Sequence, residues 1–256
     1  MSLLKIENLT HYFGGLCAVL NFNLELAPHE LVGIIGPNGA GKTTVFNLIT
    51  GVYRPTEGSI VLNGRELLGK RPAAITAGGI ARTFQNIRLF NNLSVLDNVR
   101  IAQYNRIRYN PLEALLHIWR YDKVEEIAAR RALDLLERFN LTEFAEAQAK
   151  NLPYGMQRRL EIVRALATNP QILLLDEPAA GMNPSEIDRL IEFILWIKNE
   201  FALTIILIEH QMRLVMGICE RLKVLDFGAT IAEGLPSEVR NDPRVLEAYL
   251  GQEAVN

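Results

Sequence analysis

A glycine-rich segment, Gly36–Thr43, constrains the fold of this chain more than any other feature of its sequence. It fits the pattern G-x-x-x-x-G-K-[ST], follows the apolar run Leu31–Ile35 and opens a helix expected over Lys42–Thr50. The glycines let backbone N–H groups turn toward one centre, where the following helix presents its positive end. We therefore expect a phosphate-binding loop at the end of a buried strand.

Side chains of this loop supply the rest of a phosphate site. Lys42 brings a positive charge for the β- and γ-phosphates, and Thr43 brings a hydroxyl for Mg²⁺. A glycine-rich turn with a solvated lysine is the competing interpretation, and the flanking strand and helix argue against it. The residues expected to contact the nucleotide here are Gly36, Pro37, Asn38, Gly39, Ala40, Gly41, Lys42, Thr43 and Thr44.

Two adjacent carboxylates, Asp176 and Glu177, follow the apolar run Ile172–Leu175. Parallel sheets collect ligands at the carboxyl ends of their strands, and adjacent strand residues point to opposite faces. We therefore expect different roles: Asp176 holds Mg²⁺ through water, and Glu177 orients or deprotonates the attacking water. An acidic loop that caps the next helix is the alternative.

His210 and Gln85 are further candidates. His210 follows another buried run, Thr204–Ile208, and could reach the γ-phosphate of a nucleotide on the neighbouring loop. Gln85 lies where the strand pattern gives way to a helical insert. Its amide could sense Mg²⁺ or water, although its residue type alone favours a plain polar loop residue.

Alternating strand and helix patterns predict an α/β fold with a mostly parallel sheet. Leu3–Leu9 and Phe22–Leu26 alternate apolar and polar residues, which is typical of half-buried antiparallel strands. The middle of the chain is rich in helix formers, and Pro236–Leu250 should form two short helices. We expect residues 1–256 to form a single domain with a nucleotide-binding core at 1–84 and 160–235, an inserted helical subdomain at 85–159 and C-terminal helices at 236–256.

The charge balance and cysteine content narrow the possible functions. The chain of 256 residues carries 27 basic and 29 acidic side chains, a net charge of −2, which argues against a general nucleic-acid binder. Two cysteines, no signal pattern and no apolar run of roughly 20 residues predict an intracellular, soluble chain. Any membrane role would then depend on a partner.

Together, the phosphate loop, the acidic strand end, Gln85 and His210 resemble the ATP-binding subunit of ABC transporters. Leu152–Leu160 lies where that family carries its LSGGQ signature. The resemblance covers the whole chain. It implies a P-loop NTPase core with a mixed, largely parallel sheet, an N-terminal antiparallel β-subdomain and an inserted helical subdomain.

The resemblance also implies an ATPase that uses ATP and Mg²⁺. Phe13 is similar to the aromatic residue that stacks on adenine, with Tyr12 as the second choice. Glu177 corresponds to the catalytic glutamate and His210 to the catalytic switch histidine. The other residues implied are Thr43, Gln85 and Asp176 at the metal, Asn183 in the D-loop, and Leu152, Pro153, Tyr154, Gly155 and Met156 in the signature.

The signature departs from the family pattern. Pro153 replaces the serine and has neither a hydroxyl nor an N–H to offer a γ-phosphate. Gly155 N–H and the following helix start remain as donors. Asn183 replaces the D-loop aspartate and also makes a good helix cap with Pro184 and Glu186. We therefore expect this signature to contribute little to a partner's ATP.

Within the family, several segments resemble the first ATPase subunit of branched-chain amino acid importers: Arg82–Phe90, Ala179–Pro184, Ile208–Met212 and Glu247–Gly251. This resemblance implies import through a permease pair, a second ATPase subunit that is identical or homologous, and indirectly a periplasmic or surface binding protein, with no nucleic-acid partner. It implies a peripheral position on the cytoplasmic face of the inner membrane.

Apolar and aromatic side chains in residues 86–121 suggest a docking surface. Most of them should form the small core of the insert, while the segment next to Gln85 should make a groove for a permease helix. The set comprises Ile87, Leu89, Phe90, Tyr104, Tyr109, Leu115, Leu116, Ile118 and Trp119.

The sequence alone leaves other functions open. The ATPase could serve another cargo, as in urea or amide import or lipid export. It could be a soluble ABC ATPase acting on ribosomes or in DNA repair, although such proteins usually have two cassettes or a long coiled-coil insert. A phosphate-loop kinase would leave the signature region unexplained.

Overall fold

The computed structural model describes residues 2–104 and 119–253. Its contacts divide the chain into two compact units, Met1–Gln85 with Gln171–Asn256, and Asn86–Pro170. We call them the core unit and the inserted unit. Four residues expected at the docking surface, Tyr109, Leu115, Leu116 and Ile118, lie outside the described residues.

The core unit begins with an antiparallel sheet in the order β2-β1-β4-β5. Leu4 pairs with Leu26 and Ile6 with Leu24, and all four side chains are buried. The alternating pattern of Leu3–Leu9 and Phe22–Leu26 therefore predicted the first part of β1 and the last part of β2, where one face packs on the core and the other faces solvent. The strands are β1 (Leu4–Phe13), β2 (Leu16–Leu26), β4 (Glu57–Leu62) and β5 (Arg65–Glu66).

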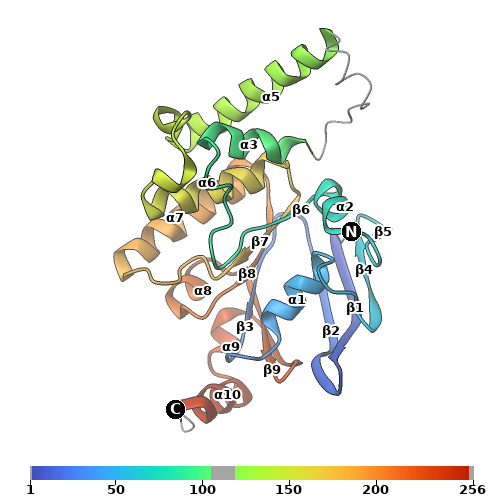
Figure 1. Cartoon of the computed structure of the whole chain (residues 1–256). Helices are drawn as coiled ribbons and strands as arrows, with labels where there is room; N and C mark the ends of the chain where they lie inside the picture. The colour runs from blue at the N-terminus through green and yellow to red at the C-terminus, as the bar shows by residue number, and fades with distance from the viewer. Residues whose placement is uncertain (1, 105–118, 254–256) are drawn as a thin grey trace. The chain divides into compact units, whose positions relative to one another are not determined.

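A second sheet of six strands, in the order β10-β9-β3-β8-β7-β6, carries the phosphate loop (Figure 1). Neighbouring strands from β9 to β6 are parallel, and only β10 is antiparallel to its neighbour. The sheet is thus mixed and largely parallel, as the fold class requires. Its strands are β3 (Leu31–Ile35), β6 (Ile80–Arg82), β7 (Ile172–Asp176), β8 (Thr204–Ile208), β9 (Arg221–Asp226) and β10 (Ala229–Gly234).

Helices connect these strands. Asn183 accepts a hydrogen bond from the N–H of Glu186, whose carboxylate accepts one from the N–H of Asn183, so the predicted helix cap is confirmed. The two predicted C-terminal helices are also present. The helices of the core unit are α1 (Lys42–Ile49), α2 (Pro72–Gly78), α7 (Pro184–Glu200), α8 (Met212–Ile218), α9 (Pro236–Val239) and α10 (Pro243–Glu253).

The inserted unit is built from helices α3 (Val95–Gln103), α5 (Trp119–Arg138) and α6 (Tyr154–Ala167), with short 3₁₀ turns at Thr142–Phe144 and Ala149–Asn151. A half-buried ion pair and a buried hydrogen bond join α3 to α5: Arg100 pairs with Glu125 at 2.7 Å, and the Gln103 amide donates to the carbonyl of Ala128 at 3.1 Å. The expected boundary at residue 159 falls inside α6. Because this helix packs on α3 and α5, the unit extends to Pro170.

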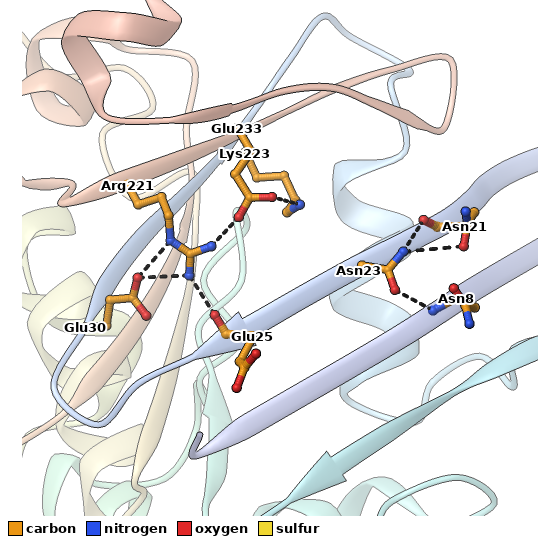
Figure 2. A network of polar contacts seen from close by, with 8 residues as sticks. All are labelled: Asn8, Asn21, Asn23, Glu25, Glu30, Arg221, Lys223 and Glu233. Atoms are coloured by element: carbon orange, nitrogen blue, oxygen red, sulfur yellow. Dashed lines mark hydrogen bonds and ion pairs between the residues drawn. The ribbon is translucent and has the colours of Figure 1, made fainter. Parts of the chain in front are cut away.

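The hairpin of β9 and β10 was not predicted, because charged residues interrupt its apolar pattern. Figure 2 shows how these charges are held: Glu233 on β10 contacts both Arg221 and Lys223 on β9. Arg221 also donates to the Glu30 carboxylate at 2.9 Å and to the Glu25 carbonyl at 2.6 Å. The base of the hairpin is therefore fixed to the end of β2 and to the segment before β3.

Within residues 2–104 and 119–253, no helix combines the length and the apolar character needed to cross a membrane.

Candidate functional site

The phosphate loop connects β3 to α1 and is packed so tightly that two glycines are required by space. A Cβ on Gly36 would lie 2.0 Å from the carbonyl oxygen of Leu225, and one on Gly41 would lie 2.5 Å from that of Ala18. Both residues also have a positive φ, which L side chains rarely adopt. Strands β2 and β9 therefore pack closely against the loop and restrict its conformation.

Lys42 is the first residue of α1, and its side chain contacts the start of the loop. Its ammonium donates to the carbonyls of Gly36 at 2.7 Å and Pro37 at 2.8 Å, and the side chain is buried. Burial lowers the pKa of Lys42, while the nearby Glu177 and Asp176 act in the opposite direction. Two of its three N–H groups are used by the loop, so one can be directed to a phosphate oxygen.

A cavity of about 410 Å³ opens beside Lys42, within the range for small-molecule sites. It brings loop residues together with Glu177 and an aromatic residue from β1. Among the residues that the structure describes, Phe13 lines the cavity and Tyr12 does not, which favours Phe13 as the base-stacking residue. The lining residues are Phe13, Leu16, Cys17, Ala18, Asn38, Gly39, Ala40, Gly41, Lys42, Thr43, Thr44, Glu177, Phe227 and Gly228.

Phe13 belongs to a small aromatic cluster at the cavity wall. Its ring centroid lies 4.6 Å from that of His11 and 5.2 Å from that of Tyr53, with both pairs edge to face. The Phe13 side chain is nevertheless exposed, so one of its faces is available to a flat ligand.

The two carboxylates differ in backbone conformation, and this corrects the expectation that they occupy opposite faces of a strand. Asp176 is the last residue of β7, whereas Glu177 has left the strand with φ +45°. The N–H of Glu177 still donates to the Ile208 carbonyl of β8 at 2.9 Å. The left-handed turn, rather than strand alternation, directs the Glu177 side chain into the cavity.

Glu177 is the point where three of the predicted residues meet. The amide of Gln85 donates to its Oε2 at 2.7 Å, and His210 Nδ1 lies 3.9 Å from the same oxygen. The second distance is too long for a hydrogen bond. Neither Gln85 nor His210 lines the cavity itself; Gln85 is hydrogen-bonded to Glu177, which does, and His210 lies near the same carboxylate.

Arg82, for which the sequence predicts no role of its own, forms a buried ion pair with Asp176. Its guanidinium donates to Asp176 Oδ2 at 2.7 Å and to Asn47 Oδ1 at 2.7 Å, and both side chains of the pair are less than 10% exposed (6% and 7%). The Phe46 and Phe84 rings lie on it, with centroids at 5.4 and 4.9 Å. The sequence feature that could have indicated this ion pair is the position of a charged residue, Arg82, at the end of the short strand β6.

Arg82→Ala is expected to lower the free energy of unfolding by about 3–5 kcal/mol, because Asp176 would be left as a buried carboxylate without its counter-ion. Urea unfolding at neutral pH measures this loss. Arg244→Ala is the matched control: Arg244 pairs with Asp242 in an exposed ion pair, so its loss should change the stability far less. Equal stability of the two variants would contradict a structural role for the Arg82–Asp176 pair.

Glu209 is a second residue for which the sequence predicts no role of its own. Its fully buried carboxylate accepts hydrogen bonds from the N–H groups of Ala179 at 2.7 Å, His210 at 2.9 Å and Gln211 at 3.0 Å. It therefore ties the loop after β7, which holds Glu177, to the loop after β8, which holds His210. A glutamate directly before a candidate histidine was the sequence signal.

The predicted metal ligands offer oxygen donors of the kind that Mg²⁺ prefers. They are the Thr43 hydroxyl, the Gln85 amide oxygen and Asp176, whose Oδ2 is used by Arg82 while Oδ1 can face a bound ion or its water. In the described part of the chain, no group of three or more His, Cys, Asp or Glu side chains could hold a metal ion. The donor set therefore fits an ion bound largely by phosphate and water.

The signature residues lie in the inserted unit, at the start of α6. Pro153 is the N-cap, and Tyr154 and Gly155 begin the first turn, where N–H groups have no acceptor within the helix. The carbonyl of Pro153 accepts from the N–H of Met156 at 2.9 Å, and that of Leu152 accepts from the Gln157 amide at 2.8 Å. The helix start can thus still donate hydrogen bonds, although Pro153 cannot.

Two family models match the sequence. The ABC transporter model matches residues 19–180, and the branched-chain amino acid ATP-binding cassette transporter model matches residues 229–255.

Curated proteins similar to this chain span its length. It is 48% identical over 250 residues to the high-affinity branched-chain amino acid transport ATP-binding protein LivG of Escherichia coli K12, covering 98% of each chain. It is 46% identical, at the same coverage, to the corresponding protein BraF of Pseudomonas aeruginosa.

Solved structures of ATP-binding cassettes are similar to this chain over nearly its whole length. A nucleotide-free ATP-binding cassette from an ABC transporter matches with a TM-score of 0.83 and 33% identity, over 97% of this chain and 99% of the other. The ADP conformation of an ABC transporter cassette matches with a TM-score of 0.84 and 33% identity, over 98% and 99%.

Proposed function

Because the chain belongs to the ABC transporter family of ATP-binding cassettes, we propose that it is the ATP-hydrolysing subunit of an importer for branched-chain amino acids. The observation that carries the ATPase part is the cavity that joins the phosphate loop to Glu177. The cargo is proposed from the printed function of the full-length relatives and from the C-terminal match at residues 229–255.

In this proposal the phosphates of ATP lie in the loop, on the N–H groups at the start of α1, with one N–H of Lys42 turned toward them. Phe13 stacks on adenine. Glu177 accepts the proton of the attacking water, Gln85 holds the Glu177 carboxylate, and His210 binds the γ-phosphate. Thr43, Asp176 and Gln85 would hold Mg²⁺, which neutralises phosphate charge when it is bound.

The proposed partners are a second ATPase subunit, identical or homologous, and two integral-membrane permease subunits, with a periplasmic or surface binding protein acting indirectly. The chain would lie peripherally on the cytoplasmic face of the inner membrane, without nucleic acid. The altered signature around Pro153 favours a non-identical ATPase partner, because two unequal sites tolerate one weak signature.

The proposal is tested by ATP-dependent leucine uptake into vesicles that contain this chain, its co-purified membrane partners and the binding protein. Uptake of leucine, isoleucine or valine that needs ATP supports it. Uptake of urea or an amide, or lipid export, would replace the cargo assignment. Partners that are ribosomal or DNA-repair proteins, with no permease, would overturn a transport role.

Phe90→Asp is expected to reduce leucine uptake at least about tenfold while ATP turnover of the isolated chain changes less than about twofold. The Phe90 side chain is 47% exposed, although Asn98 holds both its N–H and its carbonyl, so the ring is presented on a fixed backbone. A charge at an apolar contact with a permease helix would disfavour docking. Uptake and phosphate release measure the two effects.

The matched control is Ile127→Asp, which changes a side chain of the same unit that is 49% exposed. It should leave both activities near wild type. Equal loss of uptake in the two variants, or equal loss of uptake and ATPase in Phe90→Asp, would argue against docking at Phe90.

A further inference from the structure

The tip of the β9–β10 hairpin carries an aromatic residue in an unfavourable place. Phe227 and Gly228 have φ values of +42° and +81°, the positive pair that two-residue hairpin turns require. Asn-Gly is the usual choice for such turns, whereas a bulky side chain at positive φ is a genuine outlier. Phe227 is also 87% exposed. Neither the turn nor packing within the chain accounts for a phenylalanine here.

The hairpin tip is attached to the phosphate loop. The N–H of Gly228 donates to the Ala40 carbonyl at 3.0 Å, and its carbonyl accepts from the N–H of Leu20 at 2.9 Å. A Cβ on Gly228 would lie 2.8 Å from the Ala18 oxygen, so the approach is close. Together with the ion pairs at the hairpin base (Figure 2), these contacts hold Phe227 at a fixed place beside the loop.

Phe227 lines the same cavity as Phe13, Lys42 and Glu177. An exposed, strained aromatic residue that is fixed at the rim of a ligand cavity points to a ligand with a flat apolar face. The two phenylalanines come from different parts of the core unit, Phe13 from the end of β1 and Phe227 from the β9–β10 turn.

We propose that Phe227 is a second base-binding residue, which covers adenine from the hairpin tip while Phe13 stacks on it from β1. This inference rests on the proposed ATPase function and adds a residue to its site. Phe227 would contribute to binding of the base and not of the phosphates. The chain should therefore lose nucleotide affinity, but not phosphate affinity, when this ring is removed.

Phe227→Asn separates a role in ligand binding from a role in folding. The substitution should weaken ADP binding while it leaves the stability of the fold unchanged or higher. Asparagine suits the positive φ of the turn, so the melting temperature should stay or rise. Affinity for Mg²⁺–ADP should fall about tenfold, the order of effect expected for one base–aromatic contact. Affinity for Mg²⁺–pyrophosphate, the matched probe without a base, should stay within about twofold. Calorimetric titration of the full chain measures both.

Phe227→Trp provides a second readout in case the Asn variant fails to fold. It should bind ADP like wild type, and ADP but not pyrophosphate should quench its added fluorescence. The natural tryptophans, Trp119 and Trp196, also fluoresce, so the same titration of the unsubstituted chain measures their contribution.

Unchanged ADP affinity in Phe227→Asn, or an equal fall for ADP and pyrophosphate, would overturn this inference and leave the proposed function intact. Absence of ADP quenching in Phe227→Trp would also overturn it. Failure of the unsubstituted chain to bind ADP would instead overturn the proposed function.

Discussion

Glu177→Gln is expected to reduce ATP turnover by at least about a hundredfold and to leave ATP affinity within about threefold of wild type. The substitution keeps the shape of the side chain and an oxygen that accepts from Gln85, which now lies 2.7 Å from Glu177 Oε2. It removes the group that takes a proton from water, a contribution of about 10²–10⁴-fold in rate. Phosphate release and calorimetric binding, measured on one preparation, test both parts.

The control for this variant is Glu192→Gln, an exposed glutamate on α7 of the same unit. It should hydrolyse ATP at the wild-type rate. Turnover near wild type in Glu177→Gln with binding retained would remove Glu177 from the catalytic role. Loss of binding would show that Glu177 holds the nucleotide and does not act on water.

Lys42→Ala is expected to weaken ADP and ATP binding by at least about a hundredfold, because charge-assisted bonds to phosphate in a poorly solvated site are strong. The fold should remain. Burial lowers the pKa of Lys42, which means that the charged form is held at a cost to the folded state below that pKa. Loss of the charge therefore removes this cost, which offsets the hydrogen bonds lost at Gly36 and Pro37.

Titration with ADP and a melting curve together check this prediction. Lys70→Ala, which changes an exposed lysine of the same unit, is the control and should bind ADP normally. Wild-type ADP affinity in Lys42→Ala would contradict the phosphate assignment of the loop. A large fall in melting temperature would show that the hydrogen bonds of Lys42 stabilise the fold by more than the burial of its charge costs.

Local patterns in the sequence predicted the strands and helices that frame the site, since burial on one or both faces leaves a readable period. Leu31–Ile35 and Thr204–Ile208 are continuous apolar runs, and both are fully buried strands. The cap at Asn183 was readable for the same reason, because its partner Glu186 lies only three residues away.

Contacts between distant segments could not be read in this way. Arg82 meets Asp176 across 94 positions, and no local period indicates such a pair. The sequence did not predict strand β9, because the charged Lys223 interrupts the apolar pattern that is typical of buried strands. In the structure Lys223 is buried and paired with Glu233. The turn at Glu177 depends on backbone φ, which the residue type alone does not predict at a non-glycine position.

A structure of Glu177→Gln with ATP and Mg²⁺ tests the proposed site most directly. We expect Lys42 Nζ to lie within about 3 Å of a phosphate oxygen, the usual length of a charge-assisted hydrogen bond, with the altered residue 177 beside the γ-phosphate. A triphosphate bound away from Gly36–Thr43, or held there with residue 177 turned out of the cavity, would contradict it.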